Sequence, residues 1–402
     1  MNKIKVVHTW LRANWVLIVA GMTIGAVLVG LCFWQLGKLF NGAHPLELES
    51  LARFAEFKNP WETPLNAPYY TLVKIVQSVS NSSAIMSLRY TSAGLSVASI
   101  IFYAWGMKRL RTTLSAVTST ILAATASWFL LFARLGSPYV MYIFWPSLFF
   151  LLATYLYRNK YIPTMLSVTA LALGLGMYTP LVYLGVIPML LYGALQKKSL
   201  TQLLSTKVFV TAGAVAAISI APLLLACLRS FDTVKTLLGA PLAWPGPVSF
   251  IERIASLLAS PFIASPINPS LHIGRQPLLD VFTTICVILG AAILLATVTR
   301  SAKIATSAAL GMFLVVVALQ PAHQALLAVF IVPIYVFAGV GIHELLRQWF
   351  SVFPRNPVAR SVGLSLVLVV IAMASYYHFS RYFIVRPNMP EVKAQYQSVT
   401  IE

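Results

Sequence analysis

The stretch WVLIVAGMTIGAVLVGLCFWQLG (Trp15–Gly37) decides the fold class, because it is a long apolar run without a charged residue. A second run, Leu278–Val298, is broken only by one acid near its start. Both exceed the roughly 18 apolar residues that indicate a membrane helix. Hydrophobic residues make up 59% of the 402 residues and the mean hydropathy is +0.81, more apolar surface than a soluble fold could bury. We therefore predict an all-α, polytopic integral membrane protein.

About eleven spans are expected, in a single transmembrane domain that covers residues 1–402. They lie near 15–37, 84–107, 113–133, 138–157, 162–178, 180–196, 208–228, 278–299, 304–320, 324–345 and 362–380. The fifth and sixth spans are separated by a turn at Tyr178-Thr179-Pro180.

Short basic clusters predict the orientation, because positive residues favour the cytoplasmic side. These clusters fall on the same side as the N-terminus: Lys108-Arg109-Arg111, Arg158-Lys160, Lys197-Lys198-Lys207, Arg300-Lys303 and Arg347-Arg355-Arg360. We therefore expect a plasma (cytoplasmic) membrane protein with its N-terminus inside and its C-terminus outside. The net charge of +19 is then mostly a topology signal with attraction to anionic lipids, and no nucleic-acid partner is expected.

Two outer loops are long enough to carry a site, residues 38–83 and 229–277. In the first, the spacing of apolar residues predicts interfacial helices at Leu46–Phe57 and Tyr69–Val79, separated by a proline-rich turn. In the second, an interfacial helix is expected at Ser249–Leu258. We expect the working site between these two loops.

The acids are unevenly distributed. Four of the ten acidic residues fall in the first outer loop: Glu47, Glu49, Glu56 and Glu62. Carboxylates gathered at one boundary between water and membrane suit a base that acts on a substrate there.

Several short stretches, in this order along the chain, resemble a known family. They are Asn66-Ala67-Pro68-Tyr69-Tyr70, Ser87-Leu88-Arg89-Tyr90-Thr91-Ser92-Ala93, Trp128–Arg134 with Ser137-Pro138-Tyr139, Gly176-Met177-Tyr178-Thr179-Pro180, and Gly274–Asp280. With the acid-bearing loop after the first span, they resemble the GT-C superfamily of membrane glycosyltransferases. The nearest likeness is to the family 39-like branch of protein O-mannosyltransferases and aminoarabinose transferases. The resemblance covers roughly residues 1–350.

This resemblance implies transfer of a sugar from a polyprenyl-phosphate donor to an extracytoplasmic lipid, glycan or protein acceptor. Inverting transfer needs a base for the acceptor and positive charge for the departing phosphate. The family usually has an aspartate after the first span, whereas this chain has His44-Pro45-Leu46-Glu47-Leu48-Glu49-Ser50. We choose Glu49 as the base, with Glu47 as the second candidate.

Arginine suits the phosphate because its planar fork fits two oxygens. Arg134 is the preferred phosphate partner, because it stands almost alone in a short outer turn. Further candidates for the same role are Arg89, Lys74 and Arg275.

Simpler explanations stay open for these residues. Glu49 and Arg53 are four positions apart and can form an ion pair on a solvated helix face. Arg134 can extend to the lipid headgroups. A divalent metal held by His44 with Glu47 or Glu49 is an alternative to a site without a cofactor.

Other classes of function predict other patterns. An ion-coupled transporter would carry ionisable groups near mid-membrane, and the expected spans are almost free of acids. A non-catalytic GT-C-derived scaffold, or a protein that binds a lipid-linked sugar, is the main rival, because the usual aspartate is missing. The sugar, the acceptor and the oligomeric state cannot be deduced from the sequence.

Overall fold

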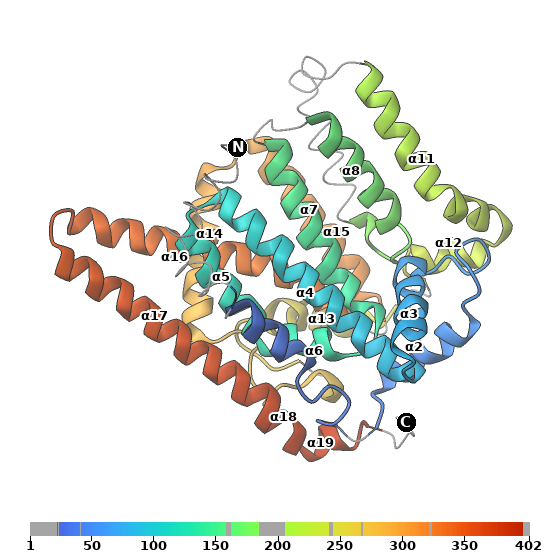
Figure 1. Cartoon of the computed structure of the whole chain (residues 1–402), viewed down its shortest axis with the longest axis horizontal. Coiled ribbons are helices and arrows are strands. Elements are labelled where there is room, and N and C mark those ends of the chain that lie inside the picture. Colours follow the sequence, from blue (N-terminus) through green and yellow to red (C-terminus); the bar gives the residue numbers. More distant parts are fainter. Residues whose placement is uncertain are drawn as a thin grey trace, which may run out of the picture.

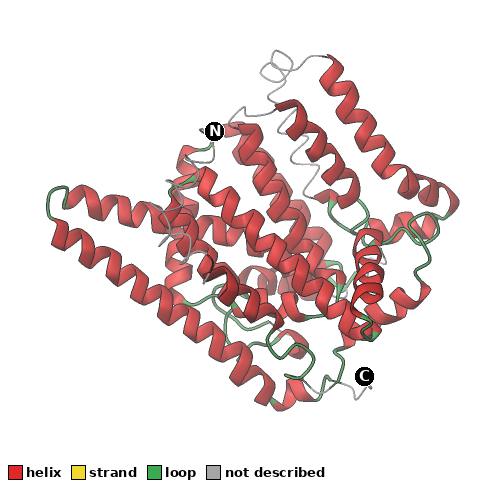
Figure 2. Ribbon diagram, in the orientation of Figure 1, coloured by secondary structure: helices red, strands yellow, loops and turns green. Residues whose placement is uncertain are grey.

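The computed structural model describes residues 22, 24–40, 42–157, 162–184, 206–240, 244–266, 268–320 and 324–396. Within these ranges every regular element is a helix (Figure 2). The all-α prediction is confirmed for this part of the chain. Most of the span expected at 180–196, and the first part of the one at 15–37, lie outside the described residues.

The helices follow a short apolar helix at Ile24–Phe33. In chain order the longer ones are α2 (Pro45–Glu56), α3 (Ala67–Ser80), α4 (Ala84–Leu110), α5 (Thr113–Thr125), α6 (Ser127–Arg134), α7 (Met141–Tyr157), α8 (Ile162–Gly176), α11 (Thr206–Arg229), α12 (Phe231–Leu237), α13 (Pro247–Ala259), α14 (Val281–Thr297), α15 (Arg300–Ala318), α16 (Ile331–Val352) and α17 (Pro357–Ser380). Shorter turns are η1 (Pro138–Val140), η2 (Pro269–Leu271), η3 (Ala325–Phe330), the π-helical η4 (Arg381–Val385), α18 (Arg386–Asn388) and α19 (Pro390–Lys393).

Five described helices are long and apolar enough to cross a membrane, or six if one bent pair counts as a span. They cover Ala84–Leu110, Pro138–Leu156, Lys207–Arg229, Ala325–Val352 and Pro357–Asn388. The helices at two further predicted spans, Pro163–Gly176 and Val281–Thr297, are apolar but shorter. The chain therefore has the helices of a membrane protein, while the predicted number of eleven spans is not confirmed.

The predicted helices of the two outer loops are present, with ends that differ by one or two residues. They form α2, α3 and α13. Helix α2 begins with a capping box: the N–H of Leu46 donates to His44 Nδ1 at 3.2 Å, and the N–H of His44 donates to the Glu47 carboxylate at 2.9 Å. Pro45 at the first helical position fits this start, because its missing N–H would have no helical partner.

The span predicted at 113–133 is not one straight helix. It bends by 62° between α5 and α6, where Ala126 has an extended backbone (φ −55°, ψ 127°). The first residues of α6 are held by polar contacts: Ser127 Oγ lies 3.0 Å from His378 Nδ1, and Trp128 Nε1 donates to Tyr335 Oη at 3.3 Å. A hydropathy pattern does not predict this bend, because apolar residues continue through it.

The arrangement brings the two outer loops together. Figure 1 shows α12, from the second loop, beside α2 and α3 at one end of the helices. A shared cavity lined by Arg53, Tyr70 and Thr236 agrees with this view. After the second loop, α14 packs very closely on α16, because Gly290 and Gly341 have no side chains at their crossing.

Candidate active site

The first acid of the cluster, Glu47, is buried in an ion pair. Arg89 donates from Nε to Glu47 Oε1 at 2.8 Å and from Nη2 to Oε2 at 2.7 Å. The N–H of Gly136 donates to Oε1 and the N–H of His44 to Oε2, both at 2.9 Å. An ionised carboxylate accepts about four hydrogen bonds. Glu47 therefore has its full set and fastens α2 to α4 and to the turn after α6.

The protonation of Glu47 follows from these contacts. Burial raises the pKa of the Glu47 carboxyl, but the hydrogen bonds and charge of Arg89, with the N–H groups of His44 and Gly136, outweigh it and lower the pKa. The carboxylate stays ionised and fully occupied. This geometry argues against Glu47 as the base and gives it a structural role instead.

The second acid, Glu49, faces a cavity of about 320 Å³. This cavity is lined by residues of both outer loops and of the turns between them: Glu49, Ser50, Arg53, Asn66, Tyr70, Ser137, Pro138, Tyr139, Tyr142, Pro180, Leu181, Thr236, Gly239, Ala240, Gln320 and Leu326. A cavity is thus present between the two loops, and its role as the working site stays a prediction. Its size lies in the range of small-molecule pockets.

Glu49 is paired with Arg53 at the edge of this cavity. Arg53 Nη2 lies 2.9 Å from Glu49 Oε1, and the side chains are 46% and 54% exposed respectively. The ion pair expected from their spacing of four residues is thus present. An exposed pair of this kind is weak and is easily exchanged for another partner. Among the described residues, the carboxylate of Glu49 and the guanidinium of Arg53 are therefore the charged groups of this cavity that a ligand can reach.

Two further polar residues of the cavity, Asn66 and Tyr70, were not among the predicted site residues. Asn66 has a left-handed backbone (φ 54°), and its N–H donates to the Tyr178 carbonyl at 2.8 Å. Asn66 Oδ1 and Tyr70 Oη are both buried and have no hydrogen-bond partner among the described residues. Both residues lie in the stretch Asn66-Ala67-Pro68-Tyr69-Tyr70 that resembles the family, but nothing in that stretch indicated that they line a cavity.

None of the four predicted phosphate-binding residues lines this cavity. Arg89 is held by Glu47. Arg134 is buried, donates from Nη1 to the Leu31 carbonyl at 2.8 Å, and lies over the Phe383 ring at 5.0 Å from its centre. Arg134 and Arg89 instead border a second cavity of about 20 Å³, which has room for one water molecule.

The other two basic candidates lie on the surface. Lys74 donates to the Lys58 carbonyl at 2.9 Å and lies over the ring of Phe57. Arg275 forms an exposed ion pair with Glu391. Arg53, which sequence reasoning considered only as an ion-pair partner, is the basic residue that reaches the cavity of Glu49.

The residues proposed as metal ligands are used in other ways. His44 Nδ1 accepts the N–H of Leu46, and Glu47 is saturated by protein donors. In the part of the chain that the structure describes, no group of three or more His, Cys, Asp or Glu side chains could hold a metal ion. The three cysteines are free thiols, at Cys32, Cys227 and Cys286.

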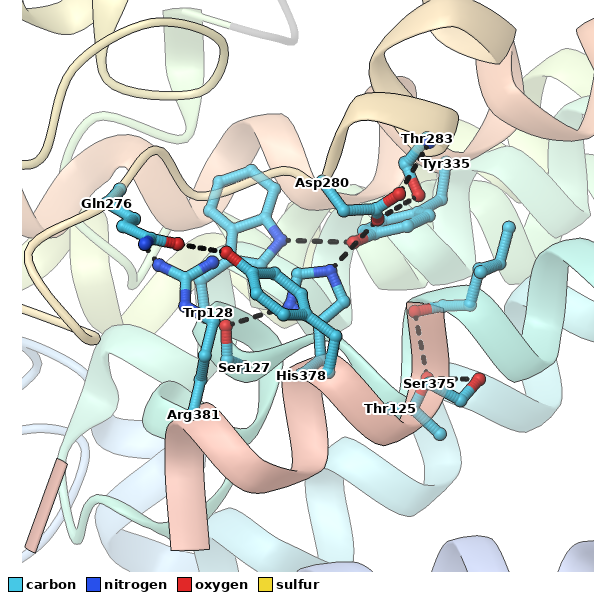
Figure 3. Close-up of polar contacts among 12 residues, drawn as sticks. Thr125, Ser127, Trp128, Gln276, Asp280, Thr283, Tyr335, Ser375, His378 and Arg381 are labelled. Carbon is cyan, nitrogen blue, oxygen red and sulfur yellow. Dashed lines mark hydrogen bonds and ion pairs between the residues drawn. The ribbon is translucent and has the colours of Figure 1, made fainter. Parts of the chain in front are cut away.

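A buried polar network lies where the second outer loop ends (Figure 3). Asp280 caps α14 by accepting the N–H of Thr283 at 2.9 Å, and Asp280 Oδ2 lies 3.1 Å from His378 Nε2. Through its other nitrogen His378 contacts Ser127, so the network joins α14, α17 and α6. None of these three side chains lines the cavity of Glu49 or the small cavity beside Arg134. Through these contacts the network holds Ser127 at the start of α6, next to the bend.

Comparison with protein-family models gave no match, and comparison with curated proteins gave none. Solved structures of the oligosaccharyltransferase of Archaeoglobus fulgidus share the fold. Its apo form aligns with a TM-score of 0.56 at 12% identity, over 98% of this chain and 61% of that one. The form with Zn and sulfate aligns with a TM-score of 0.50 at 13% identity, over 94% of this chain and 57% of that one.

A likeness at this level of identity shows the fold alone. Because that oligosaccharyltransferase has a GT-C fold, the GT-C likeness predicted from the sequence is confirmed for the fold. The chain spans less than two thirds of the length of that protein. Its place in the branch of O-mannosyltransferases and aminoarabinose transferases stays a prediction.

Proposed function

We propose that this protein transfers a sugar from a polyprenyl-phosphate donor to an acceptor on the outer face of the membrane. The observation that carries the proposal is the position of Glu49, on the wall of a cavity that both outer loops line. The GT-C fold supports it, because a solved neighbour with this fold is an oligosaccharyltransferase, and another structure of it holds an acceptor peptide.

In the proposed reaction Glu49 takes the proton of the acceptor as the acceptor attacks the anomeric carbon. The bond from that carbon to the phosphate oxygen breaks, and polyprenyl phosphate leaves with the bonding electrons. The configuration at the anomeric carbon is inverted, since one displacement occurs. We assign the leaving phosphate to Arg53, which lies on the cavity, rather than to the buried Arg134.

The Glu49–Arg53 ion pair implies that the donor binds before the acceptor is deprotonated. While the pair is closed, the carboxylate is neutralised by its neighbour one helical turn away. A phosphate bound to Arg53 would compete for the guanidinium and release Glu49 to accept a proton. The donor would thereby prepare the base for the acceptor.

The same pair also favours the second candidate, a non-catalytic protein that binds a lipid-linked sugar. In that case the ion pair stays closed and the cavity holds its ligand without turnover. The two functions differ in a measurable way, because only the enzyme releases polyprenyl phosphate.

The test is turnover of radiolabelled polyprenyl-phosphate sugars by the protein in nanodiscs. Glu49→Gln should slow transfer about a hundredfold or more, since general-base catalysis contributes about 10²–10⁴-fold. Glu56→Gln, a neutralised acid of the same helix that does not line this cavity, serves as the matched control and should retain activity. Binding without turnover by the wild type would favour the second candidate, and full activity of Glu49→Gln would remove Glu49 as the base.

A further inference from the structure

Two neighbouring buried tyrosines at the start of α3 differ in the partners of their hydroxyl groups and in their access to the cavity. Both are buried, with 0% of Tyr69 and 2% of Tyr70 exposed. The Tyr69 hydroxyl lies 3.2 Å from the Leu88 carbonyl and 3.0 Å from Ser92 Oγ, so it is satisfied within the protein. The Tyr70 hydroxyl has no partner among the described residues. Tyr70, unlike Tyr69, lines the cavity of Glu49.

Asn66, the N-cap residue of α3, also has a buried polar atom without a partner among the residues that the structure describes. Its side chain is 7% exposed, and its Oδ1 has no partner in the described structure. The bond from its N–H to the Tyr178 carbonyl fixes the strained left-handed backbone and leaves the carbonyl oxygen of the side chain unused. As the N-cap residue, Asn66 precedes the first turn of α3, and both Asn66 and Tyr70 line the cavity of Glu49.

Buried polar groups without partners are uncommon, because they lose water and gain nothing in return. Strained backbone in a protein also tends to occur where a ligand binds. Within the described part of the chain, Asn66 has both a buried polar atom without a partner and a left-handed backbone, and Tyr70 has a buried hydroxyl without a partner. Both residues border the cavity to which the transfer reaction was assigned.

We propose that Asn66 and Tyr70 form a hydroxyl-binding pair that holds an uncharged sugar ring in this cavity. This proposal rests on the proposed function and deepens it by naming the residues that recognise the sugar. Asn66 Oδ1 accepts a hydrogen bond from one ring hydroxyl, and the Tyr70 hydroxyl pairs with the neighbouring one. The aromatic rings of Tyr139 and Tyr142, which also line the cavity, give the apolar face of the ring a surface to contact.

The chemistry of the pair favours a neutral ligand at this position. Burial raises the pKa of the Tyr70 phenol, with Arg53 opposing the shift and Glu49 adding to it, so the hydroxyl keeps its proton. The Asn66 amide is uncharged and offers an acceptor oxygen and a donor NH₂ group, which suits the hydroxyls of a sugar. Among the described residues that line the cavity, Glu49 and Arg53 are the charged ones. The ring belongs either to the donor or to a glycan acceptor, and both present the same hydroxyls.

The test uses the whole protein in nanodiscs and four sets of probes. The first set is bare decaprenyl phosphate, and the second is decaprenyl phosphate linked to mannose, glucose, galactose or arabinose. The third set is the methyl glycosides of the same four sugars, and the fourth is a blank of buffer alone. The variants are Tyr70→Phe and Asn66→Gly, since glycine adopts positive φ without strain. Tyr69→Phe is the control, because it removes a hydroxyl that is already satisfied.

The wild type should bind at least one sugar-bearing probe more tightly than bare decaprenyl phosphate, with a signal above the buffer blank. Tyr70→Phe and Asn66→Gly should each reduce that preference about three- to tenfold, the range of one neutral hydrogen bond, with unchanged Tm and unchanged affinity for decaprenyl phosphate. Tyr69→Phe should lower Tm and keep the sugar preference. If the variants lose affinity for the lipid-linked sugars, the pair binds the sugar of the donor. If they lose affinity for the methyl glycosides, the pair binds the sugar of the acceptor.

The pair is overturned if both variants keep the wild-type sugar preference, or if the wild type prefers no sugar-bearing probe. Failure of the proposed function is a separate result. Turnover by the wild type with an unaltered preference in both variants rejects the pair and leaves the function standing. A preference lost in both variants, in a protein that turns over no donor, supports the pair and rejects transfer.

Discussion

Glu47 and Glu49 are two positions apart in the same helix and have opposite environments. Glu47 is 1% exposed and bound by Arg89, whereas Glu49 lies on an open cavity. Side chains at i and i+2 point to different sides of a helix, so one acid faces the core when the other faces out. The sequence predicted that both acids lie in one helix of the first loop. Which of them faces the core depends on contacts with Arg89 and Gly136, which are distant in sequence.

At the same scale, the Glu47–Arg89 pair predicts a dependence of stability on pH. The folded-state pKa of Glu47 lies below its ordinary value of 4.5. The contribution of the ionised carboxylate to the free energy of unfolding is therefore complete above pH 4.5, and it is lost as the pH falls through the folded-state pKa. Glu47→Gln should lower the stability by about 3–5 kcal/mol near neutral pH, because it leaves a buried guanidinium without its counter-charge. Thermal unfolding from about pH 7 to about pH 3 should show the gap between wild type and variant narrowing.

Glu49→Gln provides the comparison for this measurement. Its partner Arg53 is exposed, so the expected loss of stability is within about 1 kcal/mol. Equal stability of Glu47→Gln and wild type at neutral pH would contradict the structural role of Glu47.

At the scale of elements, α14 and α16 pack closely enough to bring their backbones into contact. A methyl group added at Gly290 would lie 1.9 Å from the Phe337 carbonyl oxygen, and one at Gly341 would lie 2.0 Å from the Cys286 carbonyl oxygen. Both contacts are with backbone, which cannot move aside as a flexible side chain can. Small residues that allow such approach are common between membrane helices.

Gly290→Ala should therefore destabilise the protein by about 1–3 kcal/mol or more, as overpacking does. Gly311→Ala in α15 is the matched control, since nothing lies within 4 Å of the added methyl group. There the change should be neutral or stabilising by up to about 1 kcal/mol, because alanine favours a helix more than glycine does. Thermal unfolding of the two variants in nanodiscs measures the difference, and a Gly290→Ala protein as stable as Gly311→Ala would refute the close crossing.

The bend between α5 and α6 shows what hydropathy leaves out. The run of apolar residues predicted a single span, while the direction of α6 is determined by Ser127 and Trp128 through partners more than two hundred residues away in sequence. By contrast, α2, α3 and α13 were predicted to within two residues, because local caps and prolines determine where they begin. Local chemistry was readable from the sequence, and contacts between distant elements were not.

At the scale of the whole molecule, the same distinction applies to the site. That the cavity lies between the two outer loops followed from loop length and acid content. That Asn66, Tyr70 and Arg53 reach it, and that Arg89 and Arg134 do not, depends on how α2 and α3 pack. A resemblance of short motifs predicted the fold well, since motif order reflects chain topology, but it said little about which side chains meet.

The orientation in the membrane is a prediction for the whole chain. In a cysteine-free background, a cysteine at Lys58 should react with an impermeant maleimide added outside intact cells. A cysteine at Lys303 should react only after the membrane is opened, because the positive clusters are expected inside. Labelling of the Lys303 position from outside would reverse the orientation and place the cavity on the cytoplasmic face.

The central claim is a single displacement in the cavity of Glu49, with that carboxylate as the base. It is tested most directly by the anomeric configuration of the transferred sugar, read by NMR on product made from a donor of known configuration. One displacement inverts the carbon, so a β-linked polyprenyl-phosphate sugar should give an α-linked product. A β-linked product would require two displacements through a covalent glycosyl–enzyme intermediate, and would contradict a single displacement with Glu49 as the base.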